Sequence, residues 1–346
     1  MVGPIVVTGA GGMLGSHLVR RLLADGHPVR GVDLRPADAP AAGLDWIVAD
    51  VRDERAMGAA LAGAAAVVNC ASALPSYPAE QIRSIIVDGA RSVLGAAAAA
   101  RVPRLVHISS TAVYGLPTVV PTTEEHPREP VDAYSAAKAE AEEVAEKYRA
   151  DGHCVTILRP KTFLGPGRMG LFAMLFEWAE EGRNFPVLGR GDVRVQMLAL
   201  EDLVDAVVAV LGAPRAVADD TYNLAAAEFG TWREDFQAVL DAAGHGKRVV
   251  GLPARPALAV LAGLQRIGLS PVYGRLLHKL MADSYVSIDK ARDRLGFAPR
   301  LSNRDAILRT YQWWRAERTT AAPGATGRTS REPWRQGALA VAKIFF

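Results

Sequence analysis

Short apolar runs alternate with longer amphipathic stretches along the N-terminal half of the chain. Residues 5–7 form a β-branched run without charge, which is typical of a strand buried in a parallel sheet. Leu14, Leu18 and Leu22 then recur at the spacing of one helix face. This alternation predicts an α/β fold built on a parallel sheet. Further strand-like runs lie at 28–33, 46–53, 64–68, 105–108 and 154–160.

The pattern is less regular after residue 170. The apolar stretch 255–280 is expected to cover a pocket beside the sheet. Residues 319–331 are rich in Thr, Ala, Gly, Pro and Arg, which is typical of a linker. Residues 333–346 are apolar but too few to span a bilayer, so we expect them to dock on this fold or on a second subunit. Helices are expected at 171–178, 201–211 and 231–243, and strands at 185–188, 193–200 and 221–224.

Glycines follow the first expected strand and precede the first helix. This order is the one that a phosphate-binding turn requires, because backbone without a Cβ can approach a pyrophosphate closely. The helix that follows offers N–H groups and the positive end of its dipole. The spacing G-x-G-x-x-G fails because Leu14 stands at the last glycine position, whereas Gly9, Gly12 and Gly15 fit G-x-x-G-x-x-G. The alternative is a tight turn that binds nothing.

Composition and charge exclude several classes of function. The chain has 346 residues, half of them hydrophobic, and a formal net charge of only +3. The sequence lacks the basic stripe that would indicate nucleic-acid binding. It also lacks a long apolar run or a leader, so we expect neither a membrane protein nor a secreted one. Two cysteines, Cys70 and Cys154, are too few for a disulfide framework or a zinc cluster. We therefore expect a cytoplasmic protein with reduced core cysteines and no metal site.

Asp33 ends the second expected strand. It follows the glycine turn at about the distance where an acid can hold both ribose hydroxyls of NAD. A carboxylate there also repels the 2′-phosphate of NADP, although Arg35 is near enough in sequence to weaken that repulsion. NAD is the expected cofactor and NADP the less favoured one. The alternative is a surface Asp that opens a turn.

A second group of polar residues follows the fifth expected strand. Ser109 and Ser110 come directly after it, and Tyr134 and Lys138 lie four residues apart on a later helix. Residues at this spacing share one helix face, and an ammonium beside a phenol favours the phenolate. Such a phenolate can take a hydroxyl proton near neutral pH. Alone, Y-x-x-x-K is common by chance, but in order with the glycine turn and Asp33 it is specific.

These motifs together resemble the extended short-chain dehydrogenase/reductases of the NAD-dependent epimerase/dehydratase family, over roughly residues 2–315. The resemblance implies a Rossmann-type doubly wound parallel sheet with a smaller C-terminal substrate-binding region. It implies catalytic roles for Ser110, Tyr134 and Lys138, with Thr111 beside them.

The resemblance also implies a set of cofactor contacts. Asp50 stands where the family places an Asp on the adenine amino group, although an Asp that caps the next helix is an equal interpretation. Pro160 packs on the nicotinamide or simply ends its strand. The expected cofactor-binding residues are Gly9, Gly12, Met13, Leu14, Gly15, Asp33, Asp50, Val51, Cys70, Ala71, Ser72, Tyr134, Lys138 and Pro160.

Three residues are candidate substrate contacts. Thr162 stands where the family often has Asn. The family's nucleotide-sugar enzymes usually carry an Arg for the diphosphate, and Arg190 and Arg194 are rival candidates, with Arg194 one residue out of register. A solvated turn charge explains either arginine equally simply.

The resemblance implies three parts of the chain. Residues 1–165 form the Rossmann domain, which strands at about 154–160 and 221–225 also join; residues 166–316 form mainly the substrate-binding region, and 317–346 the linker and tail. By analogy alone, a homodimer through helices at about 79–100 and 134–150 is expected.

Three functions remain open at this point. The first is a nucleotide-sugar epimerase, favoured because the acids that the family's dehydratases and decarboxylases carry after the catalytic serine are replaced by Thr111 and Ala112. The second is a net NAD(P)-dependent oxidoreductase, a ketoreductase or hydroxysteroid-dehydrogenase-like enzyme, on a bulky hydroxyl or ketone. The third is a non-enzymatic nucleotide sensor, against which the intact Ser110, Tyr134 and Lys138 argue.

Overall fold

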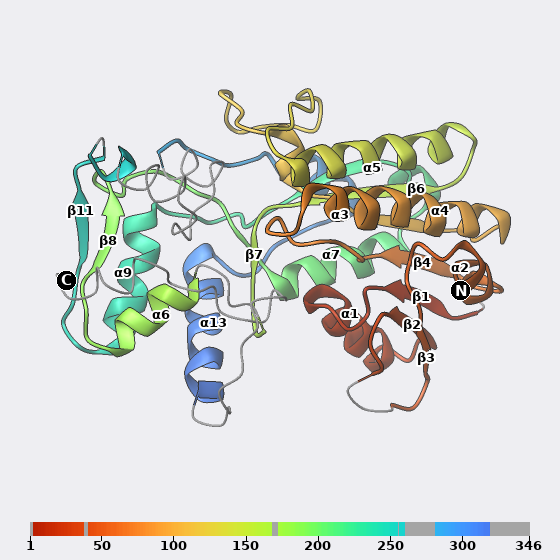
Figure 1. The fold of residues 1–346 in the computed structure, drawn as a ribbon, viewed down its shortest axis with the longest axis horizontal. Coiled ribbons are helices and arrows are strands. Elements are labelled where there is room, and N and C mark those ends of the chain that lie inside the picture. Colours follow the sequence, from red (N-terminus) through yellow and green to blue (C-terminus); the bar gives the residue numbers. More distant parts are fainter. Residues whose placement is uncertain (1–2, 38–40, 168–171, 255, 260–280, 319–346) are drawn as a thin grey trace.

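The computed structural model describes residues 3–37, 41–167, 172–254, 256–259 and 281–318. The expected linker and apolar tail at 319–346 and most of the expected cover at 255–280 lie outside these residues. Figure 1 shows a sheet with its helices at one end of the molecule and a smaller group of helices and strands at the other. None of the described helices is long and apolar enough to cross a membrane.

A seven-stranded parallel sheet forms the larger part, as expected for a doubly wound α/β fold. The order of its strands is β10-β6-β5-β4-β1-β2-β3, so β1 and β4 are central. The strands are added in one direction from β1 to β3 and in the opposite direction from β4 to β10, so the strand order reverses between β1 and β4. Their bounds are β1 (Ile5–Thr8), β2 (Val29–Asp33), β3 (Leu44–Val48), β4 (Ala66–Asn69), β5 (Leu105–Ile108), β6 (Val155–Pro160) and β10 (Thr221–Leu224).

Helices cover both faces of this sheet because alternate residues of each buried strand point to opposite sides. Val7 of β1 packs into a core with α1 (Met13–Ala24) and α7 (Leu200–Gly212), whereas its neighbour Val6 packs into a core with α4 (Gly89–Ala99) and α5 (Ala133–Ala150). The doubly wound fold is confirmed. Other helices of this part are α2 (Glu54–Leu61), α3 (Ala79–Arg83), a π-helical turn (Ser84–Asp88), a 3₁₀ turn (Thr111–Tyr114), α8 (Arg215–Ala218) and α12 (Asp289–Leu295).

The smaller part has a third core of its own, rich in aromatic side chains. Phe176, Trp232 and Tyr311 belong to this core, which joins helices that are far apart in the sequence. Two short parallel ladders complete this part, β8 with β11 and β7 with β9. Its elements are β7 (Phe163–Leu164), α6 (Phe172–Glu180), β8 (Phe185–Leu188), β9 (Leu198–Ala199), α9 (Trp232–Ala243), β11 (Val249–Leu252) and α13 (Asn303–Arg318).

The expected strand at 193–200 is wrong. Only Leu198–Ala199 is a strand, and the residues before it form isolated bridges, Arg194 to Thr231 and Val195 to Ser284. The apolar run changes partner almost at every residue, so no continuous ladder forms. The Gln196 side chain takes part in this arrangement: its Nε2 donates to the Ala226 carbonyl and its Oε1 accepts from the Val286 N–H.

Candidate active site

The glycine turn has the tight geometry that its composition predicts. Gly9 has a φ of +63°, and the Gly12 N–H donates to its carbonyl at 2.9 Å. A Cβ on Gly15 would lie 2.1 Å from the Gly9 carbonyl oxygen, so no larger residue fits there. Helix α1 begins directly after Gly12, which has no side chain to cap it. As at the start of any α-helix, the first N–H groups of α1 have no acceptor within the helix.

Asp33 contacts the glycine turn from the end of β2. Its Oδ2 accepts from the Gly11 N–H at 2.9 Å and its Oδ1 from the Arg35 N–H at 3.2 Å. The Arg35 guanidinium is 3.9 Å from the same carboxylate and mostly exposed. The carboxylate therefore lies at the edge of the turn, with one cation beside it.

The alternative interpretation of Asp50 as a helix cap is wrong. Asp53 caps α2, because its side chain accepts from the Ala56 N–H at 3.0 Å. Asp50 instead binds the Arg52 guanidinium through both carboxylate oxygens, and the hydrogen bond from Arg52 lowers the pKa of Asp50. The role of Asp50 at the adenine stays a prediction.

A single pocket brings most of the expected site residues together. It lies where the glycine turn, the ends of β4, β5 and β6, and the start of α5 meet. Of the expected residues, Gly9, Gly12, Met13, Leu14, Gly15, Cys70, Ser72, Ser110, Thr111, Tyr134, Lys138, Pro160 and Thr162 line it. The lining also includes residues that the expected site lists do not contain, namely Ala73, Leu74, Pro75, Ile108, Ser109, Ala112, Lys161 and Phe163. Outside it lie Asp33, Asp50, Val51, Ala71, Arg190 and Arg194.

Helix α5 begins with a capping box that fixes where its first turn lies. The Asp132 side chain accepts from the Ser135 N–H, and the Ser135 hydroxyl accepts from the Asp132 N–H. Tyr134 and Lys138 follow on one face of this helix, with the Lys138 Nζ 6.0 Å from the centroid of the Tyr134 ring. The cap therefore places the Tyr134 phenol in the first turn of α5, in the pocket wall.

Lys138 is a buried cation. Its side chain is 2% exposed, and its Nζ donates to the Ile108 carbonyl at 2.8 Å. Burial lowers the pKa of Lys138 to about 8, although Cys70 and Glu142 act in the opposite direction. Lys138 is therefore mostly charged at neutral pH and can stabilise a negative charge on the nearby phenol.

The serine pair occupies the end of β5. The Ser110 Oγ caps the 3₁₀ turn by accepting from the Ala112 N–H at 3.1 Å. The Ser109 hydroxyl is buried and has no hydrogen-bond partner among the described residues. Both serines line the pocket that Tyr134 and Lys138 also line.

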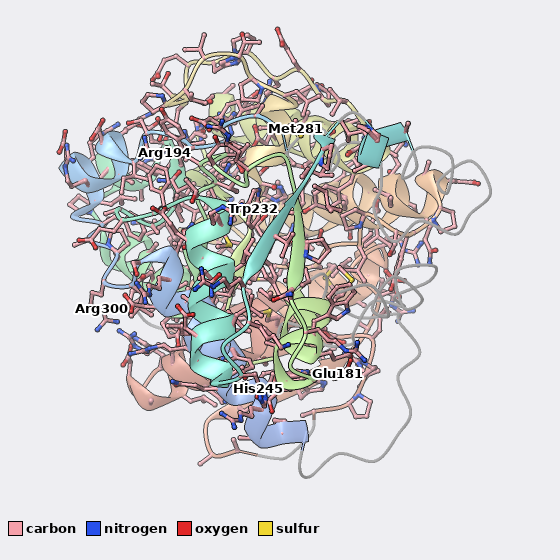
Figure 2. All side chains as sticks on the ribbon, turned by 90° about the vertical axis from the view of Figure 1, so that its left-hand side faces the viewer. Glu181, Arg194, Trp232, His245, Met281 and Arg300 are labelled. Atoms are coloured by element: carbon pink, nitrogen blue, oxygen red, sulfur yellow. The ribbon has the colours of Figure 1, made fainter. Side chains whose placement is uncertain are left out.

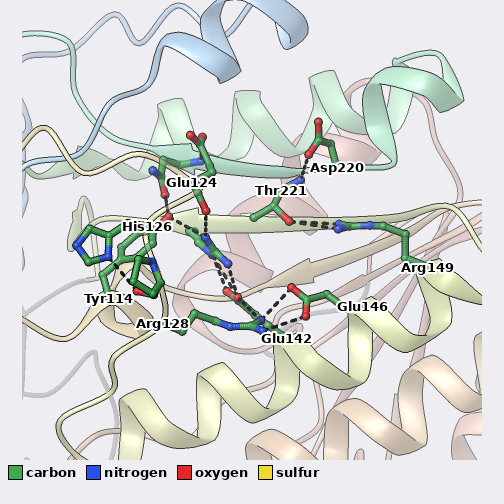
Figure 3. A network of polar contacts seen from close by, with 12 residues as sticks. Tyr114, Glu124, His126, Arg128, Glu142, Glu146, Arg149, Asp220 and Thr221 are labelled. Carbon is green, nitrogen blue, oxygen red and sulfur yellow. Dashed lines mark hydrogen bonds and ion pairs between the residues drawn. The ribbon is translucent and has the colours of Figure 1, made fainter. Parts of the chain in front are cut away.

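A buried network of ion pairs and hydrogen bonds connects α5, the helix that carries Tyr134 and Lys138, to the sheet (Figure 3). Glu142, one turn after Lys138 on α5, accepts from Arg159 of β6 at 2.6 and 2.9 Å. Arg159 also donates to the Tyr114 hydroxyl at 2.8 Å, and that hydroxyl donates to Asn223 of β10 at 2.8 Å. The network joins α5, β6, β10 and the segment after Ser110.

Two other residues near the pocket, Cys70 and His107, are uncharged. Burial raises the pKa of Cys70 to about 12, so its thiol is protonated and a poor nucleophile. Burial lowers the pKa of His107 to about 3, and this neutral imidazole contacts the Asn69 amide at 3.3 Å. Within the described residues, no cluster of His, Cys, Asp or Glu has metal-binding geometry.

Neither candidate arginine reaches this pocket. The Arg194 guanidinium stacks on the rings of Phe229 and Tyr285, at 4.8 and 5.2 Å from their centroids. In Figure 2, Arg194 lies above the start of α9, near Trp232. Arg190 lies in the turn after β8, where its carbonyl accepts from Arg233. Aromatic packing and a turn explain the two positions.

The family model for the NAD-dependent epimerase/dehydratase family matches residues 5–225. The chain belongs to this family. The match covers β1 to β10 and every residue of the pocket described above. Family membership is therefore established for the part of the chain that holds the candidate active site.

Relatives within the family differ in activity. An uncharacterised protein of Sinorhizobium fredii, y4nG, is 34% identical and covers 99% of this chain and 86% of its own. A 3β-hydroxysteroid dehydrogenase/Δ5→4-isomerase of Mycobacterium tuberculosis is 27% identical, with 92% and 95% covered. A UDP-glucose 4-epimerase of Mycolicibacterium smegmatis is 28% identical, with 90% and 98% covered.

Solved structures share the fold. The UDP-glucose 4-epimerase of Thermotoga maritima, solved with UDP-glucose, superposes with a TM-score of 0.75 at 21% identity, covering 91% of this chain and 99% of that one. The likeness extends beyond the sheet to the smaller part. The arrangement of the two parts is therefore one that the epimerase fold also has.

Proposed function

We propose that this family member is an NAD-dependent nucleotide-sugar epimerase. The observation that supports this most directly is the pocket itself: Ser110, Tyr134 and Lys138 line it together with the glycine turn. A proton acceptor, a hydrogen-bond donor and a dinucleotide-binding turn are the parts that reversible oxidation of a hydroxyl needs.

The residues present fit an NAD cofactor. The turn around Gly9 and Gly15 has no space for a Cβ, and the N-terminus of α1 opens beside it, which suits a pyrophosphate. Asp33 would hold the ribose hydroxyls, and its charge favours NAD over NADP. Small residues, Cys70 and Ser72, together with Pro160, leave room for the nicotinamide at the ends of the strands.

The chemistry that NAD supplies when bound is reversible acceptance of hydride from the substrate carbon. Tyr134 would take the hydroxyl proton from that carbon and return it at the end. Ser110 would hydrogen-bond the same oxygen, and the charge of Lys138 would favour the phenolate of Tyr134. Turning the ketone over before the hydride returns inverts the carbon and leaves NAD unchanged.

Elimination of water is not favoured at this site. The positions after Ser110 are Thr111 and Ala112, and both are buried in the pocket wall. No Asp or Glu is among the described residues that line the pocket. Elimination needs a further acid and base next to the substrate, and the described lining residues after Ser110 supply neither, so dehydratase chemistry is less favoured.

A second candidate is a net oxidoreductase that acts on a bulky hydroxyl or ketone. The specific observation in its favour is that Arg194 packs on Phe229 and Tyr285, so neither candidate arginine is available in the pocket for a sugar diphosphate. Leu74, Pro75 and Phe163 add apolar lining. The hydroxysteroid dehydrogenase among the relatives agrees with this alternative.

Product analysis separates the two candidates. The purified protein is incubated with a panel of nucleotide sugars and sub-stoichiometric NAD, and products are identified by NMR. An epimerase forms a second sugar without net change in nicotinamide absorbance. Consumption of NAD or NADH in step with product, or turnover of sterols and not of nucleotide sugars, would instead establish the oxidoreductase.

A further inference from the structure

Two buried polar side chains join α9 to α13, the helices that lie next to each other in the smaller part (Figure 1). Asp235 of α9 is 3% exposed, and Asn303, the first residue of α13, is 1% exposed. The Asn303 Nδ2 donates to the Asp235 Oδ2 at 3.0 Å. Burial raises the pKa of Asp235 to about 6, although this hydrogen bond acts in the opposite direction. Apolar side chains would fill the same space without the cost of burying polar groups, so packing alone does not explain the pair.

The Asn303 side chain binds the backbone of the segment that precedes β9. Its Oδ1 accepts from the Met197 N–H at 2.8 Å, and its Nδ2 donates to the Val195 carbonyl at 2.6 Å. All of these groups are buried, and a buried backbone N–H or C=O without a partner is costly. Asn303 therefore satisfies backbone groups that a neighbouring strand would satisfy in a continuous sheet.

The other edge of this segment shows the pattern that Asn303 reproduces. The Ser284 N–H donates to the Arg194 carbonyl at 2.9 Å, and the Ser284 carbonyl accepts from the Gln196 N–H at 3.1 Å. One peptide unit on each side thus meets a C=O and an N–H two residues apart, which is the spacing of a parallel ladder. On one edge these groups belong to the backbone of Ser284, and on the other to the side-chain amide of Asn303.

The residue that follows this segment holds the lining of the pocket. The Leu198 N–H donates to the Thr162 carbonyl at 3.0 Å, and Leu198 pairs with Phe163 in the ladder of β7 and β9. Thr162 and Phe163 both line the pocket. The backbone that Asn303 holds at Met197 therefore continues directly into the backbone that holds this part of the pocket lining.

We propose that Asn303 is a positioning residue for the substrate, acting through residues 195–198, and that Asp235 orients its amide. An ionised carboxylate can only accept hydrogen bonds, so Asp235 keeps the Nδ2 end of the amide towards itself and the Oδ1 end towards Met197. Neither side chain lines the pocket. The inference rests on the pocket binding a substrate, which both functions proposed above require.

The experiment compares the wild type with Asn303→Leu and with the double variant Asn303→Leu, Asp235→Leu, using UDP-glucose in the presence of NAD. Both variants leave the Met197 N–H and the Val195 carbonyl without the Asn303 amide. The KM for UDP-glucose should rise by about 10- to 100-fold in both, while kcat stays within about threefold. The affinity for NAD should stay within about twofold, because the glycine turn and α5 are unchanged.

The double variant separates positioning from stability. Asn303→Leu leaves the Asp235 carboxylate buried without its donor and should lower the melting temperature, whereas replacing both partners by apolar side chains should restore most of it. The KM should nevertheless stay high in the double variant. If the KM returns to the wild-type value together with the melting temperature, the pair serves only the fold and the inference is overturned. Thr310→Val is the control on the same helix, because the Thr310 hydroxyl donates to the Ala306 carbonyl of α13, and it should leave the KM unchanged.

Failure of the proposed function gives a different result. If the wild type does not turn over UDP-glucose, amide hydrogen exchange followed by NMR tests the inference without activity. Leu198 makes its hydrogen bond to Thr162 and not to Asn303, so exchange of its N–H that is about 10-fold faster in both variants would support positioning. The Phe185 N–H, which donates to the Arg248 carbonyl in the same part of the molecule, is the reference and should exchange as in the wild type. Unchanged exchange at Leu198 would refute the inference, whatever reaction the protein performs.

Discussion

The two walls of the pocket are positioned in different ways. The cofactor wall, consisting of the glycine turn, Ser110, Tyr134 and Lys138, is built largely from neighbours in sequence, such as the Gly12–Gly9 turn and the box that caps α5. The substrate wall, consisting of residues 161–163, depends on distant segments. Lys161 binds Ser284, and Phe163 pairs with Leu198.

This difference indicates which properties the two walls confer. A wall made from strand ends and helix starts keeps its geometry as long as the sheet is folded, which suits a reaction common to a family. A wall made from long-range contacts can change with any of the segments that meet there. We therefore expect variants of the cofactor wall to affect catalysis for every substrate, and variants of the substrate wall to affect selectivity.

The largest expected effect lies in the cofactor wall. Tyr134→Phe removes the proposed proton acceptor and should lower kcat by about 100-fold to 10,000-fold on every substrate, with NAD affinity and melting temperature unchanged. Steady-state kinetics and NAD titration measure this. Tyr148→Phe, on the same helix but outside the pocket, is the control. Near-normal turnover by Tyr134→Phe would refute the role of the phenol.

The cofactor wall was also the part that the sequence predicted best. The turn around Gly9 and the pair Tyr134 and Lys138 are local patterns, so their spacing in the sequence is enough to predict their geometry. Lys161 was missed because nothing in its neighbourhood in the sequence indicates that Ser284 holds it in the pocket. The run 193–200 was predicted as a strand because it is apolar, although its backbone pairs with three separate segments.

The next effect concerns the support behind the cofactor wall. Glu142→Gln leaves the Arg159 guanidinium buried without its counter-charge and should lower the free energy of unfolding by about 3–5 kcal/mol. Urea denaturation measures the loss. Glu146→Gln is the matched control, because Glu146 is 40% exposed and pairs with Arg128 at the rim, so that its loss should cost about 1 kcal/mol or less. If both variants lost the same free energy of unfolding, burial of the network would not contribute to stability.

A smaller effect is expected at the adenine side of the cofactor. Asp33→Ala would remove the acceptor that we propose for the ribose hydroxyls and the charge that we propose repels the NADP phosphate. The ratio of NAD to NADP affinity should fall by about 10- to 100-fold, as measured by titration of both cofactors. Asp45→Ala, an exposed acid on the neighbouring strand, should leave the ratio unchanged. If the wild type already binds NADP more tightly, the role assigned to Asp33 is wrong.

A pH dependence is also expected in the sheet beneath the cofactor wall. The pKa of His107 is lowered to about 3 in the folded chain, against about 6.5 when unfolded, so only the unfolded chain takes up this proton between those values. The folded state should therefore lose stability as the pH falls below 6.5, by up to about 1.4 kcal/mol per pH unit from this group.

His107→Gln keeps an acceptor for the Asn69 amide but has no proton to gain. Its melting temperature should fall less steeply than that of the wild type between pH 6.5 and 4.5. Around pH 8 the melting temperatures of the two proteins should change with pH in the same way. His245→Gln, which changes an exposed histidine of the smaller part, is the control. Parallel curves for His107→Gln and the wild type at low pH would mean that this imidazole is charged, or open to water, in the folded sheet.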